Sequence, residues 1–415
     1  MSRKAMLALA LLSSCVLTTA AEAASRTLQI IVSKDTQSLA VYDGDKVIAT
    51  SKVSTGKEGH DTPTGIFSIL EKQKFHRSNI YSNAPMPWMQ RLTWSGIALH
   101  ESDSVPRRPA SHGCVRLPGA FARELYGMTE RGVHVIIADA AVEPRVISHP
   151  DLFQPPAPVP DLLSDVPLRP STVGVTMQEV QVAMHVPKPE IDLSAPSPQK
   201  AEEAEPAPIR ILITRRTERD NIADIQSMLT ELGFDAGEPD GVVGTATRSA
   251  ILGYKRWKGL PEKGPLFTDA LIKALHASTD RPMPPAGQLL VRQGFKPILS
   301  QSVPIRDPQI ALGTHFFNVA DVDRKKGAAE WQGLSLPNVL SASTRQRFGI
   351  TEDASEGPEA MKAALDRIEI PADLRAQLGK MISTGSSLTI SDEGVGPDTG
   401  DGTDFITITH SKARS

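Results

Sequence analysis

A proline-rich stretch at residues 141–208 divides this chain of 415 residues and limits where folded domains can lie. The stretch holds 14 of the 33 prolines, together with a run of Ala and Glu at residues 201–205. Such a composition buries too little apolar surface to offset the entropy of ordering the backbone. We therefore expect an extended, largely disordered linker here, with separate domains on either side of it. The length points the same way, because one ordinary core rarely serves so long a chain.

The N-terminal segment predicts export from the cytoplasm. Residues 1–4 include Arg and Lys, residues 5–12 are apolar, and residues 21–23 have the small-x-small pattern of a cleavage site. The apolar run is too short to span a bilayer, and no later run is long enough, so we expect no transmembrane helix in the mature chain. We predict a signal peptide over residues 1–24 and a periplasmic protein. The alternative is a lipoprotein signal, in which Cys15 is lipidated and kept as a membrane anchor.

Residues 26–140 have the pattern of a mainly β domain. Short apolar runs alternate with polar turns, and Asp43–Asp45 is a strong hairpin signal. Pro118 begins a short amphipathic helix that we expect to end at Met128, before a last strand over residues 133–138. The net charge of −3, with no basic stripe, argues against nucleic acid as a partner.

The strongest candidate for chemistry is Cys114. It follows His112 and Gly113, and His100 lies a short loop upstream. The only other cysteine is Cys15, so the mature chain offers Cys114 no disulfide partner, and a free thiol is unusual in an oxidising compartment. A neighbouring imidazole and a following helix N-terminus both favour the nucleophilic thiolate, and a glycine leaves backbone N–H groups open to an oxyanion. The segment predicts an acyl-transfer site.

A metal site was weighed against this interpretation. His100, His112 and Cys114 have suitable ligand chemistry, but no fourth ligand lies at a convincing spacing. The aspartates between residues 398 and 404 do not follow the spacing of a calcium loop. We therefore expect neither a metal nor another cofactor.

The C-terminal half predicts two further domains. Residues 209–279 show helical periodicity in three short segments, and residues 287–410 are strand-rich. Aligning Leu117 with Ile370 without gaps gives six identities in 22 positions, within the same order of loop, helix, glycine and strand. The C-terminal domain is thus expected to be a decayed second copy of the first, with Arg367 at the position of Cys114. Chance similarity of a short helix–strand unit is the alternative.

Two known families resemble these segments. The Ser-His-Gly-Cys-Val-Arg motif at residues 111–116, together with Gly96–His100, Thr62–Gly65 and residues 84–89, resembles the L,D-transpeptidase (YkuD) catalytic domain. Residues 217–277 are similar to the three-helix peptidoglycan-binding module, through positions that include Leu232–Phe234, Pro239–Gly241 and Gly259–Leu260. The resemblance implies a multidomain, mainly β protein: a YkuD-like β-sandwich with a short helix, a three-helix domain and a β-rich C-terminal domain.

The resemblance also implies a function. It predicts a cell-wall transferase that forms 3–3 cross-links in peptidoglycan through a cysteine acyl-enzyme on tetrapeptide stems, with stem peptides and glycan strands as partners. Carried over by position, Cys114 would be the nucleophile and His100 the proton donor and acceptor, while His112 and Gly113 would shape the site. The residues expected to bind substrate or support its loop are Ser111, Arg116 and Trp88.

Two alternatives stay open at this point. The same scaffold could use water as the acceptor, as an L,D-carboxypeptidase or a hydrolase of protein–peptidoglycan links. A non-catalytic wall-binding protein would also suit the module and the C-terminal domain, although the intact Cys114 and His100 argue against it. The sequence does not distinguish an amine acceptor from water and does not indicate an oligomeric state.

Overall fold

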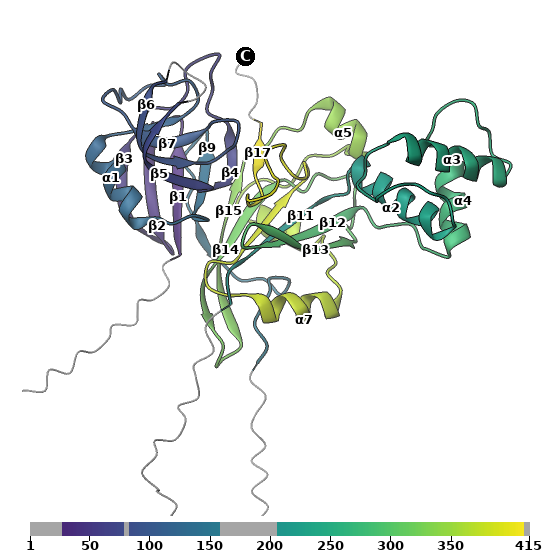
Figure 1. Ribbon diagram of the computed structural model, residues 1–415. Helices are drawn as coiled ribbons and strands as arrows, with labels where there is room; N and C mark the ends of the chain where they lie inside the picture. Colours follow the sequence, from purple (N-terminus) through teal and green to yellow (C-terminus); the bar gives the residue numbers. More distant parts are fainter. Residues whose placement is uncertain (1–26, 79–82, 158–205, 411–415) are drawn as a thin grey trace, which may run out of the picture.

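The computed structural model describes residues 27–78, 83–157 and 206–410. A β-rich N-terminal part lies directly beside a β-rich C-terminal part, and a helical module projects from the far side of the latter (Figure 1). The predicted signal peptide and Cys15 lie outside the described residues. Within the described ranges, no helix is both long enough and apolar enough to cross a membrane.

The N-terminal part is built on a six-stranded sheet with the order β17-β4-β9-β1-β2-β3. Its three central strands, β1 (Leu28–Ser33), β4 (Thr64–Ser68) and β9 (His134–Ala138), are buried at every position. Strands covered on both faces need nearly continuous apolar runs, and the sequence supplies them. β1 and β9 run parallel, whereas the other neighbours are antiparallel. The remaining strands are β2 (Ser38–Asp43), β3 (Lys46–Lys52) and β17 (Thr407–Thr409).

A four-stranded sheet with the order β5-β6-β7-β8 completes this part. Its strands are β5 (Glu71–Arg77), β6 (Pro85–Arg91), β7 (Ala98–Glu101) and β8 (Val115–Leu117), and helix α1 (Gly119–Met128) follows directly. One apolar core joins both sheets to α1, with Phe67, Leu99 and Leu125 all inaccessible to solvent. The predicted β-sandwich with a short helix is therefore confirmed.

The C-terminal part is a seven-stranded sheet with the order β10-β15-β14-β16-β11-β12-β13. It shares one apolar core with two of the three helices on this part, α6 and α7, and Trp331 is its largest fully buried side chain. The strands are β10 (Arg145–Ile147), β11 (Ile209–Arg215), β12 (Gly287–Gln293), β13 (Lys296–Val303), β14 (Thr314–Asp323), β15 (Ala328–Leu336) and β16 (Ser387–Ser391). The helices are α5 (Ala342–Phe348), α6 (Ala360–Leu365) and α7 (Ala372–Met381).

The start of the predicted linker at residue 141 has to be corrected. β10 pairs with β15, and the Trp331 indole N–H donates to the Phe153 carbonyl over 2.9 Å, with both side chains buried. This segment is ordered by partners almost 180 residues away along the chain, which local composition does not reveal. The rest of the predicted linker, residues 158–205, lies outside the described residues.

The helical module also begins later than predicted. Helices α2 (Glu218–Glu231), α3 (Thr245–Trp257) and α4 (Asp269–Thr279) surround a small core, and a capping box at Thr217 starts α2. Ile209–Arg215, which the sequence placed in the module, instead forms β11 between β12 and β16. The module is thus an insertion between two neighbouring strands of the seven-stranded sheet.

The two large sheets share a strand order. β15-β14-β16-β11-β12-β13 repeats the pattern of β17-β4-β9-β1-β2-β3, including the single parallel pair. β9 and β16 begin 253 residues apart, and so do α1 and α7, which is the offset of the repeat predicted from the sequence. We infer that the C-terminal sheet arose by duplication of the N-terminal one.

The strand pairing also sets the correspondence between β4 and β14. In the β4–β9 pair Phe67 lies opposite Val135, and in the β14–β16 pair Phe317 lies opposite Leu388. Phe67 therefore corresponds to Phe317. A shift of one residue in a strand exchanges its two faces, and both Phe67 and Phe317 are fully buried in the respective cores.

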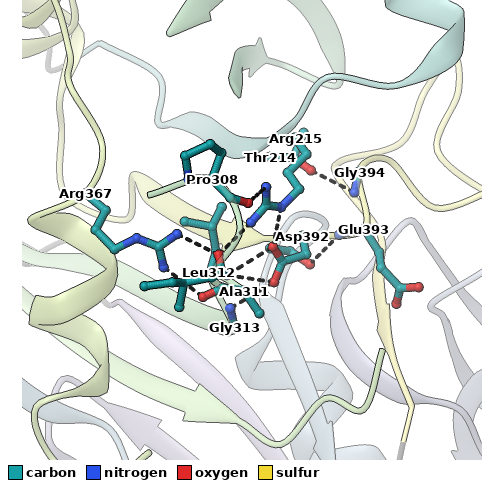
Figure 2. A network of polar contacts seen from close by, with 12 residues as sticks. Thr214, Arg215, Pro308, Ala311, Leu312, Gly313, Arg367, Asp392, Glu393 and Gly394 are labelled. Atoms are coloured by element: carbon teal, nitrogen blue, oxygen red, sulfur yellow. Dashed lines mark hydrogen bonds and ion pairs between the residues drawn. The ribbon is translucent and has the colours of Figure 1, made fainter. Parts of the chain in front are cut away.

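An ion pair recurs at the end of the parallel strands in both sheets. Lys34 lies 2.9 Å from Asp139 in the N-terminal part, and Arg215 lies 2.6 Å from Asp392 at the equivalent place in the C-terminal part. Figure 2 shows Arg367 in the same polar network, where its guanidinium donates to the Ala311 carbonyl over 2.8 Å. The position equivalent to Cys114 is thus taken by a cation that binds backbone carbonyl groups.

The two large sheets pack against each other and exchange edge strands. Ile31, Ile66 and Ile136 of the six-stranded sheet meet Phe316 and Leu334 of the seven-stranded sheet in one buried cluster. β17, from the end of the chain, pairs with β4 (Figure 1). β10, which follows the N-terminal part, pairs with β15. Each large sheet therefore takes an edge strand from the part of the chain that builds the other sheet.

Candidate active site

A pocket at the four-stranded sheet brings most of the predicted site residues together. Cys114, His100, Ser111, His112 and Arg116 all line it. The remaining lining residues are His76, Ser78, Ala84, Pro85, Met86, Arg91 and Gly96.

Two short parallel strands place Cys114 and His100, the candidate nucleophile and base. β7 and β8 pair so that His100 lies opposite Arg116 and Leu99 opposite Val115. Since side chains alternate along a strand, the fully buried Leu99 and Val115 fix one face in the core. His100 and Arg116 are thereby turned to the other face, and Cys114, two positions before Arg116, shares it.

His100 is held as a neutral base. Its Nδ1 lies 2.7 Å from the Glu101 carbonyl oxygen, and burial lowers the pKa of the imidazole to about 4. The ring is therefore neutral at physiological pH, and Nδ1 carries the proton because a carbonyl only accepts. Nε2 keeps a lone pair that can take a proton.

Cys114 is half-buried, and its Sγ lies 3.3 Å from the Gly96 carbonyl oxygen, to which the thiol donates. Burial raises the pKa of the thiol above its ordinary value. The sequence argument expected the imidazole and the helix N-terminus to favour the thiolate, whereas burial is the largest influence on the pKa of the thiol and raises it. Thiol and imidazole are therefore both neutral in the resting site.

Hydroxyl groups tie the nucleophile loop in place. Ser111 accepts from the Gly113 N–H over 3.1 Å and donates to the Cys114 carbonyl, while Thr62 donates to the Gly113 carbonyl over 2.7 Å. Gly113 has a φ of 116°, and a Cβ there would lie 2.9 Å from Ile97 Cδ1. A glycine is required at this position for both reasons.

Two of the predicted residues have different surroundings from the rest. His112 is exposed at the rim of the pocket, with its ring centroid 4.7 Å from that of His60 in an edge-to-face arrangement. Trp88 does not line the pocket and instead packs edge-to-face on Tyr126 of α1, with 5.4 Å between the ring centroids. Its φ of 53° breaks the alternation of β6, so Met86 and Met89 point into the same cluster. The structure therefore does not bring Trp88 to the pocket, where the resemblance placed it.

The sequence missed other lining residues. His76 lines the pocket, with its Nδ1 2.9 Å from the Gln73 amide oxygen and its Nε2 3.4 Å from Arg91. Arg91 is fixed in turn by Glu71 at 2.8 Å. Alternation along β5 and β6 was the available signal, but neither strand had been recognised around these residues.

Among the residues that the structure describes, the group spaced to share a metal ion is His149, Asp151 and Asp366. It lies on the C-terminal part, where Arg375 already pairs with Asp151 at 2.6 Å. Cys114 does not belong to it.

Comparisons with known proteins agree with this geometry. Residues 28–137 match the family model of the L,D-transpeptidase catalytic domain, and residues 218–265 match that of a putative peptidoglycan-binding domain. No curated protein matches the chain.

Solved L,D-transpeptidases are similar over the same part of the chain. The enzyme from Mycobacterium smegmatis is 22% identical over 27% of this chain and 58% of its own, with a TM-score of 0.26. That from Stackebrandtia nassauensis is 29% identical over 28% and 58%, with a TM-score of 0.26. That from Mycobacterium tuberculosis H37Rv is 18% identical over 27% and 57%, with a TM-score of 0.26. The chain thus spans less than two thirds of each of these relatives.

Proposed function

We propose that this chain, which carries an L,D-transpeptidase catalytic domain at residues 28–137, joins peptidoglycan stem peptides by 3–3 cross-links. The observation that carries the proposal is the pairing of β7 with β8, which sets Cys114 and a neutral His100 in one pocket. A buried thiol beside an imidazole with a free lone pair is suited to acyl transfer.

In the first half-reaction the sulfur of Cys114 attacks the carbonyl carbon of the third stem residue. His100 Nε2 takes the thiol proton, and then delivers it to the amine of the terminal D-Ala as the peptide bond breaks. The products are free D-Ala and a thioester between Cys114 and the shortened stem.

The second half-reaction reverses these roles. The side-chain amine of a neighbouring stem attacks the thioester and loses a proton to His100. The new amide forms, the sulfur departs, and the proton returns from His100 to Cys114. With water in place of the amine, the same steps would give hydrolysis, so the acceptor decides which reaction results.

Because the Cys114 thiol and the His100 imidazole are both neutral at rest, the first step needs a proton transfer that costs free energy. Moving a proton from a thiol with a raised pKa to an imidazole with a pKa of about 4 costs about 1.4 kcal/mol for each unit of difference. Transfer is therefore expected to accompany attack, and donors at the developing oxyanion have to lower the barrier. Arg91 and Arg116, the cations of the pocket lining, favour the negative charge electrostatically.

The remaining domains suit an enzyme of the cell wall. The helical module matches a family of putative peptidoglycan-binding domains, so we assign it the role of holding the chain on its substrate. This role agrees with export to the periplasm, whether residues 1–24 are cleaved or Cys15 is lipidated as an anchor.

The test compares muropeptides from a strain lacking the gene after complementation with the wild-type chain or with Cys114→Ala. We expect 3–3 dimers with the wild type only. Equal amounts of these dimers in both strains would refute the proposal. Loss of tetrapeptides without new dimers would identify the hydrolase instead.

A further inference from the structure

The end of the chain reaches the neighbourhood of the catalytic cysteine. Residues 396–409, which we name the C-terminal bridge, leave the seven-stranded sheet and finish as β17 in the six-stranded sheet. On one side, Arg292 of β12 holds the bridge through the carbonyls of Gly400 and Thr403, at 2.7 and 3.1 Å. The bridge is therefore held by the C-terminal part on this side.

The first contact with the N-terminal part lies at the turn between β6 and β7. The Ser95 hydroxyl donates to Asp398 Oδ2 over 2.6 Å. Ser95 directly precedes Gly96, whose carbonyl accepts from the Cys114 thiol. Asp398 is thus connected to the sulfur through three links: the hydrogen bond from Ser95, the peptide bond from Ser95 to Gly96, and the hydrogen bond from the thiol to the Gly96 carbonyl.

The second contact is β17 itself. Ile406 is fully buried in the core of the N-terminal part, and the Thr64 hydroxyl donates to the Thr409 carbonyl over 2.9 Å. Gly65 has a φ of 149°, and a Cβ there would lie 2.1 Å from the Thr407 carbonyl oxygen, so β4 is shaped to receive this strand. Thr62, just before β4, fixes the Gly113 carbonyl.

We propose that the C-terminal bridge positions the nucleophile, with Asp398 as a positioning residue that acts through Ser95 and the Gly96 carbonyl. The bridge thereby makes the C-terminal part a component of the active site, although that part has no cysteine of its own. The effect that we expect on turnover rests on the proposed function. The effect on the pKa of the Cys114 thiol does not depend on any reaction.

A hydrogen bond from the thiol to a carbonyl favours the protonated form and so raises the pKa of the thiol. Asp398→Ala removes one of the contacts that hold the turn, beside the Ser95–Thr93 hydroxyl pair and the bond from the Ile97 N–H to Thr93. We expect the Gly96 carbonyl to shift and its bond with the thiol to weaken, so the pKa of Cys114 should fall. Asp398→Asn keeps an oxygen that can accept from Ser95 and should restore the wild-type behaviour. Asp373→Ala removes an exposed carboxylate from α7 and serves as the matched control.

The experiment measures alkylation of Cys114 by iodoacetamide against pH in the full chain, followed by mass spectrometry of the peptide that contains it. For Asp398→Ala we expect a midpoint at lower pH, and acyl-enzyme formation from a tetrapeptide stem that is about two- to tenfold slower with KM unchanged. Asp398→Asn and Asp373→Ala should match the wild type in both measurements.

An unchanged alkylation midpoint in Asp398→Ala would overturn the proposal, as would an Asn variant as impaired as the Ala variant. Equal thermal unfolding of the variants ensures that the difference is local. If the wild-type chain forms no acyl-enzyme, the proposed function fails, while the alkylation profiles still decide the role of Asp398.

Discussion

The two large sheets have the same strand order, yet only the N-terminal part has a cysteine before its helix, in the pocket at the four-stranded sheet. At the position of Cys114 the C-terminal part has Arg367, whose guanidinium binds the carbonyls of Ile310 and Ala311 at 2.6 and 2.8 Å. In the N-terminal part the equivalent loops are joined by the Thr62 hydroxyl, which leaves the pocket open. In both parts a side chain thus joins these loops: a hydroxyl beside the Cys114 pocket, and a guanidinium at the position of Cys114 in the C-terminal part.

The largest expected effect distinguishes Cys114 from Arg367, the residue at the equivalent position of the C-terminal part. Cys114→Ala should lower acyl transfer by about 10³-fold or more, because no other group replaces the nucleophile. Adding Arg367→Cys to that variant should restore nothing, since Leu365 stands at the position of His112 and no base accompanies the new thiol. Mass spectrometry of the acyl-enzyme formed on a stem peptide measures both, and an adduct at residue 367 would contradict the comparison.

The recurring ion pair gives a comparison in stability. Arg215 and Asp392 are 2% and 1% exposed, whereas Lys34 and Asp139 are 20% and 34% exposed. Asp392→Ala leaves a buried guanidinium without its counter-ion and removes the acceptor of the Leu312 and Gly313 N–H groups.

We therefore expect Asp392→Ala to cost about 3–5 kcal/mol of unfolding free energy and Asp139→Ala about 0–1 kcal/mol. Denaturant unfolding of the full chain provides the measurement. Equal losses would mean that burial does not distinguish the two pairs.

A smaller effect concerns two buried histidines, one in each part. Burial lowers the pKa of both His100 and His315 to about 4. The unfolded chain takes up these protons near pH 6.5 and the folded chain only near pH 4, so each histidine lowers stability as the pH falls between these values. Each contributes up to about 3 kcal/mol across the whole interval.

His315→Gln should flatten the loss of stability between pH 6.5 and 4 and leave acyl transfer intact, because an amide can still pair with Ser335 and the Leu312 carbonyl. His100→Gln should flatten it equally but abolish transfer. In the wild type, the acid limb of kcat/KM should lie near pH 4. Unfolding free energies and kcat/KM, measured between pH 6.5 and pH 4, test the predictions for both histidines. An acid limb of kcat/KM near pH 6.5 would contradict a buried neutral base.

The candidate site was largely predictable from sequence because its residues are close together in the chain. Cys114, His112, Gly113 and Ser111 form one loop, and a single strand pairing adds His100. The raised pKa of the thiol was not predictable, since burial depends on Met86 and Met89 of another strand. His76 and Arg91 were missed for the same reason.

The same contrast holds for the fold. Features set by residues close together in the chain were predictable, and features set by distant partners were not. Helices α1 and α7 and the repeat offset are visible in the sequence, whereas the order of β10 depends on β15, far along the chain. Residues 209–215 were assigned to the helical module because they directly precede it, although their hydrogen bonds go to β12 and β16.

The insertion of the helical module has a mechanical consequence. The chain enters the module after Arg215 and leaves it before Gly287, and these two residues lie opposite each other at one end of the β11–β12 pair. A pull on the module is therefore applied to both strands at the same end, and it separates their hydrogen bonds one pair at a time, starting from that end. The six-stranded sheet and the strands that hold Cys114 lie outside this path of force. A chain tethered under tension would yield first at β11 and β12, the strand whose Arg292 holds the C-terminal bridge.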